Sequence, residues 1–324
     1  MSIQLLVKDS ETEEELDISD LVQEVSWSTS LMGRAGQLNF TLIPSEHNFS
    51  SGSKVWFSVI SNFTKTNVFM GYVFTTRFNK NHALNVLCYD QTRYLNNRDV
   101  YVFKDITAAQ IFEKVCKDYQ LKYKIADSDG YICAPVTRDN ISLMDMVQLA
   151  LDETFIKTGK YLFVRDDFGV LTLDDINNYK RNYVIDKDML QEDFSYSRSI
   201  DKETATRIKL VRKDPSTSKH QISVYEDSKL TNKWGVLLHY EVIDSAGTQR
   251  ELDDRAKKLL ELKGRPLERL SFTTEGVLDV FAGCGLFVNL EDISYNKVNK
   301  FCIVTAARHI FRNEEHLMDL EVNL

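Results

Sequence analysis

A chain of 324 residues is too long for one ordinary hydrophobic core, and this length suits two or three domains. Hydrophobic residues make up 43% and charged residues 27%, which is ordinary for a globular protein and argues against long disordered stretches. The formal net charge is −8 and no run of lysine or arginine occurs. Specific nucleic-acid binding is therefore not expected, because an acidic surface repels phosphate backbones.

The sequence also gives an expectation about the cellular compartment of the protein. Residues 1–19 lack the basic and then apolar pattern of a signal peptide. No apolar run approaches the roughly 20 residues of a membrane-spanning helix, so we expect no membrane insertion. The cysteines are scattered and odd in number, which predicts free, mostly buried thiols in a reducing compartment. They are Cys88, Cys116, Cys133, Cys284 and Cys302.

Strand-like patterns dominate residues 1–98. Bulky or β-branched residues alternate with smaller or polar ones in 37–43 and 54–60. Residues 44–53 form a long polar loop, and 79–82 form a turn between two further strands. Many short strands joined by polar turns predict a small barrel or sandwich.

The hydrophobic period then changes from two to 3.6, which indicates helices. Thr107 and Gln110 form a potential capping box at the start of the first helix. Ser142 can cap the second helix, and Gly159 can end it. Together with a following hairpin, these helices predict a compact mixed α/β domain over residues 99–185.

Strands return in residues 186–324, and one helix over residues 249–263 interrupts them. Gly264 stands where a left-handed helix cap is expected. The chain is therefore predicted to be α+β and mainly β. Two β domains, 1–98 and 186–324, are separated by the α/β domain 99–185.

Two short motifs resemble metal sites but are better explained as turns. Asp167–Gly169 matches the magnesium-binding triplet of protein kinases, but the other kinase motifs are missing and a hairpin turn accounts for it. Asp127–Gly130 resembles the start of a calcium loop, yet Arg138 stands where the essential glutamate belongs. Aspartate and glycine are common turn residues. No metal or cofactor site is predicted.

A hydrolase centre is the main catalytic alternative. Glycines flank Cys284, and His309 lies downstream. A nucleophilic cysteine needs a pKa lowered by a helix N-terminus or a cation, whereas Cys284 stands in a glycine turn between strands. Adjacent carboxylates such as Asp174 and Asp175 carry no specific signal for a glycosidase. We therefore predict no catalytic residue.

A cluster of aspartate, arginine and tyrosine marks the change from strand period to helix period. Asp90 and Arg93 are close enough to pair or to hold loop backbone, and Tyr94 and Leu95 can pack beneath them. We interpret Tyr89, Asp90, Arg93 and Tyr94 as the signature of a structural joint between two domains.

This segment carries a family resemblance. "GYVFTTRF", then "YDQTRYLNN", then a helix that opens with Thr-Ala, resembles the hub proteins of PBSX-like contractile prophage tails and R-type bacteriocins. Further matches are "NISLMDMVQLAL", "TGKYLFVRDDFGVLTL" and the end, "FCIVTAARHIFRNEEHLMDLEVNL", so the resemblance spans the whole chain. The residues of the first match are Gly71, Val73, Tyr89, Asp90, Gln91, Arg93, Tyr94, Leu95, Asn97, Thr107 and Ala108.

The resemblance implies a fold and a role. Such hubs, which are similar to the VgrG N-terminal region and to contractile-phage hubs, have two tube-like β-barrels per chain separated by an α/β domain. Three chains form a ring whose six barrels match the sixfold tail tube on one side and the threefold spike on the other. The implied location is the virion baseplate, after assembly in the bacterial cytoplasm.

The resemblance also implies partners. These are two further copies of the chain, the tail tube protein, the central spike, the tape-measure protein and other baseplate proteins. Loops 44–53 and 212–220 are the expected contact loops. Because the chain ends at Leu324 with the second predicted barrel, lytic activity is expected to come from a separate protein. The alternatives are a tail-associated peptidoglycan hydrolase and a VgrG-type secretion-system component.

Overall fold

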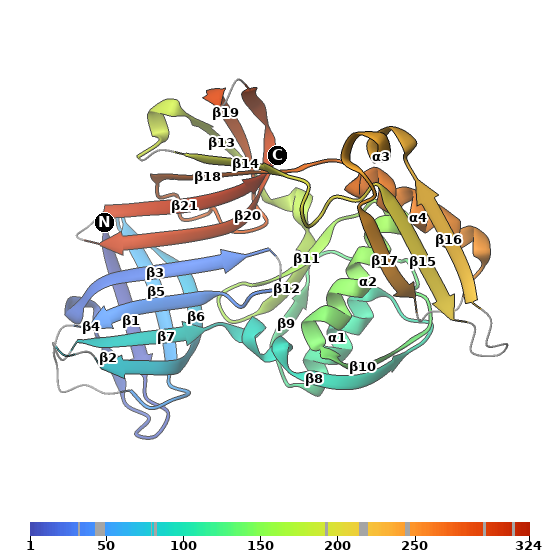
Figure 1. Ribbon diagram of the computed structural model, residues 1–324. Helices are drawn as coiled ribbons and strands as arrows, with labels where there is room; N and C mark the ends of the chain where they lie inside the picture. The colour runs from blue at the N-terminus through green and yellow to red at the C-terminus, as the bar shows by residue number, and fades with distance from the viewer. Residues whose placement is uncertain are drawn as a thin grey trace.

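The computed structural model of the chain is described for residues 1–31, 33–42, 49–78, 80, 83–191, 194–213, 220–243, 247–293, 296–312 and 315–324. The predicted contact loops at 44–53 and 212–220, and the turn at 79–82, lie partly outside these residues. Figure 1 shows two β units stacked on one side and two mixed units of helices and strands on the other. None of the described helices is long and apolar enough to cross a membrane.

Two β units share one sheet. The first β unit consists of β1 (Ser2–Lys8), β2 (Glu15–Asp17), β3 (Val22–Ser30), β4 (Gln37–Leu42), β5 (Lys54–Ser61), β6 (Thr64–Phe78) and β7 (Leu84–Tyr89). The second β unit consists of β13 (Lys180–Asp186), β14 (Ser195–Ser199), β18 (Leu267–Glu275), β19 (Gly285–Ile293), β20 (Asn296–Arg312) and β21 (Glu315–Asn323). Within the described residues, these thirteen strands are connected in the order β14-β18-β21-β20-β3-β4-β7-β6-β5-β1-β2, and β19 and β13 branch from β20.

Strand β20 joins the two units because it is long enough to belong to both. Its first half pairs antiparallel with β19, and its second half pairs antiparallel with β3, from Ala306 opposite Ser30 to Arg312 opposite Glu24. β21 lies along the other edge of this second half. Figure 1 shows β20 and β3 side by side where the two units meet. The relative position of the units is thus set by backbone hydrogen bonds.

The first β unit curls around its own core. Alternate residues of β4, Leu38, Phe40 and Leu42, point into this core and are fully or almost fully buried. Phe311 of β20 also enters it and meets Phe57 edge-on, with ring centroids 5.0 Å apart. In the described part of the unit β1 and β3 are not paired, so backbone hydrogen bonds do not close the predicted barrel there.

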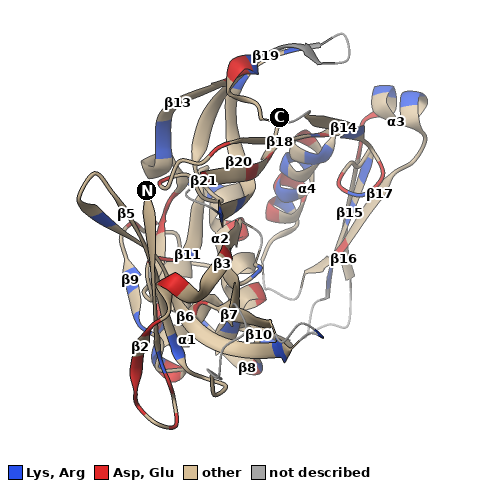
Figure 2. Cartoon of the chain, turned by 90° about the vertical axis from the view of Figure 1, so that its left-hand side faces the viewer, with Lys and Arg blue, Asp and Glu red and all other residues tan. Residues whose placement is uncertain are grey.

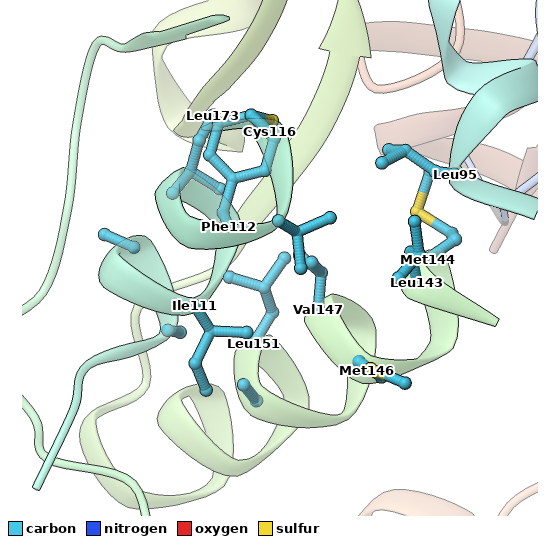
Figure 3. Close-up of a cluster of buried hydrophobic side chains, with 14 of the residues drawn as sticks. Leu95, Ile111, Phe112, Cys116, Leu143, Met144, Met146, Val147, Leu151 and Leu173 are labelled. Carbon is cyan, nitrogen blue, oxygen red and sulfur yellow. The ribbon is translucent and has the colours of Figure 1, made fainter. Parts of the chain in front are cut away.

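The central unit follows β7. It consists of β8 (Arg98–Phe103), α1 (Ala108–Asp118), β9 (Tyr123–Ile125), β10 (Val136–Ser142), α2 (Leu143–Thr158), β11 (Leu162–Asp166) and β12 (Leu171–Asp175). β8 pairs with β10, and β12 lies between β11 and β9. In Figure 3, Ile111 and Phe112 of α1 face Val147 and Leu151 of α2 across this core.

The helix ends of the central unit match the sequence signals. The Thr107 hydroxyl accepts the Gln110 N–H at 3.3 Å, and the Gln110 side chain accepts the Thr107 N–H at 2.9 Å. The Ser142 hydroxyl accepts the Asp145 N–H at 3.0 Å. Gly159 ends α2 with φ of 80°. The predicted capping box, N-cap and C-cap are confirmed.

Of the two motifs that resemble metal sites, Asp167–Gly169 is a hairpin turn, and Asp127–Gly130 follows β9 as an irregular segment that bends at Asp127. Asp167 and Val170 close a hairpin turn between β11 and β12, with the Asp167 N–H donating to the Val170 carbonyl at 2.8 Å. Phe168 and Gly169 have φ of 50° and 83°, as a type I′ hairpin turn requires. In the other motif, Asp127 accepts a hydrogen bond from Lys160 Nζ at 2.7 Å.

The outer unit consists of β15 (Arg207–Lys213), β16 (His220–Glu226), α3 (Ser228–Trp234), β17 (Leu238–Ile243) and α4 (Gln249–Lys263). Its three strands form a separate sheet, β16-β15-β17, whereas the sequence grouped them with the second β domain. The helix α4 covers one face of this sheet and carries acidic and basic residues along its exposed length (Figure 2). The short helix α3 was not predicted; Asp227 caps it.

The predicted helix at 249–263 is confirmed as α4, but its expected cap is not. Gly264 has φ of −73°, so it is not left-handed. Its N–H instead donates to the Leu260 carbonyl at 2.7 Å and continues the helical pattern. The predicted class, α+β and mainly β, is confirmed by the order of the elements.

Candidate functional site

The predicted joint signature lies where β7 ends and a 3-10 helix, η2 (Gln91–Asn96), begins. Asp90 caps η2, with its Oδ1 accepting the Thr92 N–H at 3.0 Å and the Thr92 hydroxyl. Asp90 is buried, and a Cβ atom added to Gly36 would lie 2.1 Å from Asp90 Oδ2. Of the two roles open to Asp90, holding backbone is therefore the observed one.

Arg93 and Tyr94 project from η2 onto aromatic side chains. The Arg93 guanidinium lies 5.6 Å from the Phe74 ring centroid and 6.0 Å from that of Tyr89. The Tyr94 ring meets the Tyr72 ring edge-on, with the ring centroids 6.0 Å apart. The structure thus brings Tyr89, Arg93 and Tyr94 together against β6, whereas Asp90 lies against Gly36.

The next residue enters a different core. Leu95 is fully buried in the core of the central unit, where it lies beside Met144 and Leu143 of α2 (Figure 3). Within two residues, therefore, the chain passes from contacts with β6 to contacts with α2.

Gln91 makes three further hydrogen bonds, which connect η2 to the central unit. Its side-chain N–H donates to the Gly169 carbonyl, and its side-chain oxygen accepts the Lys122 N–H at 3.3 Å. Its own N–H donates to Asp166 Oδ2 at 3.3 Å. One buried amide therefore ties η2 to the β11–β12 hairpin and to the segment before β9. Only its place in the "YDQTRYL" motif pointed to it.

Asp90 and Asp166 form a pair of interacting carboxyl groups. Asp166 Oδ1 accepts the Gly169 N–H at 2.6 Å. Burial raises the pKa of Asp166 to about 6. Burial, and then the charge of Asp166, raise the pKa of Asp90 well above its usual range. Protonation of the pair is thus favoured relative to an exposed carboxyl.

A cavity of about 600 Å³ opens beside this pair. Its walls come from the first β unit (Trp27 and Phe69), from the central unit (Met144 and Asp166) and from the segment 276–282 that precedes β19. The three parts of the molecule therefore meet around this cavity.

Stacked arginine and aromatic side chains form the wall toward the second β unit. The Arg165 guanidinium lies 4.7 Å from the ring centroid of Phe281 and 5.0 Å from that of Tyr179. Arg181 lies 5.7 Å from the Phe281 ring and pairs with Asp279 at 3.3 Å. These contacts join β11 to β13 and to segment 276–282, and no sequence motif pointed to them.

A pair of histidines, the buried His309 and the half-buried His316, lies where β20 meets β3. The ring nitrogen Nε2 of His309 lies 2.8 Å from the Val280 carbonyl, which can only accept, so Nε2 is the donor. Its Nδ1 must then accept from His316 Nε2 at 2.9 Å. The Trp27 ring stacks on the His309 ring, with the two ring centroids 5.0 Å apart. Burial lowers the pKa of His309 to about 4 and that of His316 to about 3, so both are neutral at neutral pH.

Comparison with known proteins shows to which family the chain belongs. The model of the YqbQ-like family matches residues 25–323. The chain belongs to the YqbQ-like family. Two proteins of Bacillus subtilis (strain 168), YqbQ and the phage-like element PBSX protein XkdQ, are each 30% identical to it. Each match covers 79% of this chain and 77% of the relative.

Solved structures share the fold of this YqbQ-like chain. The 43 kDa tail protein of prophage MuSo2 from Shewanella oneidensis has a TM-score of 0.71 at 13% identity, with 98% of each chain covered. A component of the Escherichia coli type VI secretion system, described as similar to the bacteriophage T4 tail proteins gp27 and gp5, has a TM-score of 0.55 at 11% identity. That match covers 93% of this chain and 73% of the other.

In the described part of this YqbQ-like chain, Cys284 and His309 are not arranged as a catalytic dyad requires. Cys284 is fully buried, its thiol lies 3.4 Å from the Asp279 carbonyl, and burial raises its pKa. A nucleophilic thiol needs the opposite shift. Both ring nitrogens of His309 are engaged elsewhere, so Cys284 and His309 do not form a dyad.

Proposed function

We propose that this chain is the baseplate hub of a contractile phage tail or tail-like particle, such as a prophage tail or an R-type bacteriocin. Three copies form a ring that adapts the sixfold tail tube to the threefold central spike. The observation that carries the proposal is the pairing of β20 with both β19 and β3, because it holds two β units of one chain side by side. A trimer then presents six such units.

In this proposal each β unit is one tube-like domain. The domain bounds predicted from the sequence are 1–98, 99–185 and 186–324. The second tube-like domain also takes in β13 (Lys180–Asp186), because β13 pairs with β19, and the outer unit is inserted in this domain. Each tube-like domain contributes one sixth of the ring. Family membership and the shared fold of prophage tail proteins support this arrangement.

The joint of Tyr89, Asp90, Arg93 and Tyr94 transmits load in this proposal. Its contacts are short-range and varied: a backbone cap, a cation over aromatic rings and an edge-on aromatic pair. Because such contacts hold only one geometry, the central unit and the first β unit move together when the tail contracts.

Association with other proteins is supported by an exposed apolar surface on the outer unit. The face of its sheet turned away from α4 carries Ile222, Val224, Leu238 and Tyr240, each 49–55% exposed. Apolar groups gathered on a surface mark protein contacts. The proposed partners are the other two copies, the tail tube protein, the central spike, the tape-measure protein and other baseplate proteins. The particle assembles in the bacterial cytoplasm.

The test is the solution mass of the full chain by light scattering, with negative-stain class averages of the same sample. A mass of three chains and a threefold ring of six lobes around a hole are expected. A monomer that stays monomeric when mixed with its tail tube and spike proteins contradicts the proposal. A zymogram on bacterial cell walls checks the non-enzymatic role, for which no clearing is expected.

A second candidate is a VgrG-type secretion-system component. It is favoured by the shared fold with the Escherichia coli type VI component. The protein that co-purifies beneath the ring separates the two candidates: a phage-type spike supports the tail hub, and a secretion-system effector supports the alternative.

A further inference from the structure

A second cavity, of about 240 Å³, lies between the central unit and the outer unit. It is separate from the joint described above. Residues of β10 and α2 line one side, and residues of β15, β17 and α4 line the other. Four cationic side chains and three carboxylates line this cavity: Arg138, Lys157, Arg212 and Arg255, with Glu153, Glu241 and Glu251.

Arg212 is the most unusual of these residues. It lies on the face of β15 that packs against α4, and only 8% of it is exposed. Its Nη1 donates to the Thr248 carbonyl at 2.9 Å and to Gln221 Oε1 at 3.4 Å, which are both neutral oxygens. Its Nε is buried and has no hydrogen-bond acceptor among the described residues. A buried guanidinium keeps its charge, so leaving a donor unused is costly.

Arg255 repeats this pattern from α4. Its Nη2 donates to Glu241 Oε1 at 2.8 Å, but its Nε is also buried without an acceptor in the described part of the chain. Two guanidinium donors therefore remain unused at one cavity. Burial, and then the neighbouring charge of Arg255, lower the pKa of Arg212, although the carboxylates of Glu251 and Glu153 act in the opposite direction.

The carboxylates of the cavity already have donors. Glu153 accepts the Tyr131 hydroxyl at 2.9 Å and the Ala134 N–H at 3.0 Å. Glu251 accepts the Thr248 N–H at 2.7 Å, as the third residue of the capping box that Thr248 begins at α4. The local excess is thus one positive charge together with two free N–H donors.

We propose that this cavity binds a small oxyanion of the phosphate class, held by Arg212 and Arg255. Guanidinium groups present donors in a geometry that matches oxyanions, and their bonds to an anion are stronger than neutral ones. The volume is several times the roughly 30 Å³ that one water occupies in the liquid, so a tetrahedral anion fits. Bound there, it bridges the central unit and the outer unit. This inference does not depend on the hub role.

The experiment uses the full chain in a phosphate-free buffer. Calorimetric titration with inorganic phosphate, and thermal unfolding in phosphate against chloride at equal ionic strength, are compared for wild type, Arg212→Gln and Arg212→Lys. Arg198→Gln is the matched control, because Arg198 is exposed and pairs with Glu268 in the second β unit. Circular dichroism establishes that each variant is folded.

Phosphate is expected to raise the midpoint temperature of wild type and of Arg198→Gln by roughly a few degrees beyond chloride. Affinity is expected to fall at least about tenfold in Arg212→Gln, and less in Arg212→Lys, which keeps the charge. An equal response to phosphate and chloride overturns the proposal, and so does unchanged affinity in a folded Arg212→Gln. Tighter binding of malonate than of phosphate assigns the cavity to carboxylates and overturns the phosphate class.

Discussion

At the scale of single residues, the position of Asp90 at the start of η2 depends on the absence of a methyl group at Gly36. Gly36 has no side chain, and its backbone lies so close to Asp90 that an added Cβ would be 2.1 Å from Asp90 Oδ2. Asp90 cannot easily move, because it is buried and caps η2.

We therefore expect Gly36→Ala to lower the free energy of unfolding by about 1–3 kcal/mol. Denaturant unfolding measures this difference. Gly130→Ala is the control, because nothing lies within 4 Å of a Cβ at Gly130, and it should change stability by less than about 0.5 kcal/mol. Equal effects of the two substitutions would show that Gly36 has more room than the structure gives it.

The carboxyl pair predicts a stabilising substitution. Asp90→Asn keeps the oxygen that accepts from Thr92 and removes a charge that is both buried and close to Asp166. Since the pKa of Asp90 is raised in the folded state, ionising it costs stability above its unfolded pKa near 4. We expect the free energy of unfolding of Asp90→Asn at pH 7.5 to rise by about 1 kcal/mol. An unchanged value at pH 7.5 contradicts this expectation.

The histidine pair predicts a loss of stability in acid. The pKa values of His309 and His316 are lowered to about 4 and about 3 in the folded state. The unfolded chain therefore binds protons first, and stability falls as the pH drops below the unfolded value of about 6.5. Each histidine contributes up to about 1.4 kcal/mol per pH unit.

Replacing one of the pair tests that slope. Between pH 6.5 and 4.5, the free energy of unfolding of His316→Gln should depend less steeply on pH than that of wild type. His220→Gln is the matched control, because His220 is exposed on β16. If His316→Gln and wild type share one slope, the pair is protonated without cost and the neutral assignment fails.

At the scale of elements, sequence signals located helices better than sheets. Thr107, Ser142 and Gly159 marked helix ends correctly because capping is a local interaction. The strands β15, β16 and β17 were found as strands and grouped with the second β domain, whereas the structure has them in a sheet of their own. Alternation shows which face is buried and does not show which neighbour buries it. Of the candidate site, Asp90 and Arg93 stood out in the sequence.

The remaining parts of the site could not be predicted. Gln91 and Asp166 meet only after the β11–β12 hairpin folds back, 75 residues along the chain. Arg165 stacks on Phe281, which is even more distant in sequence. No local pattern encodes such contacts, because each residue type alone is typical of a surface turn or strand.

The position of β20 predicts its hydrogen-exchange behaviour. Residues 306–312 have a strand on both sides, β3 and β21. We expect their amides to exchange among the slowest in the chain, since exchange there requires opening both units. Mass-spectrometric exchange should show β2 and β16, each paired on one side only, exchanging earlier. Faster exchange of 306–312 than of β16 contradicts the shared-strand arrangement.

At the scale of the whole molecule, both cavities described above lie where chain segments far apart in sequence meet. One lies among the β units and the central unit, and the other lies between the central and outer units. A protein that holds a fixed geometry in an assembly is expected to place polar contacts at such meetings. The first β unit has its own core and is joined to the second β unit by β20.

The shared strand also sets an order of events during synthesis. β3 leaves the ribosome early, but its partner in β20 lies about 280 residues later, as does Phe311 of the first core. At roughly 5–20 residues per second, this gap lasts on the order of 15–60 s. During that time the edge of β3 is an unpaired template for other strands. The first unit to be made is therefore among the last to be completed.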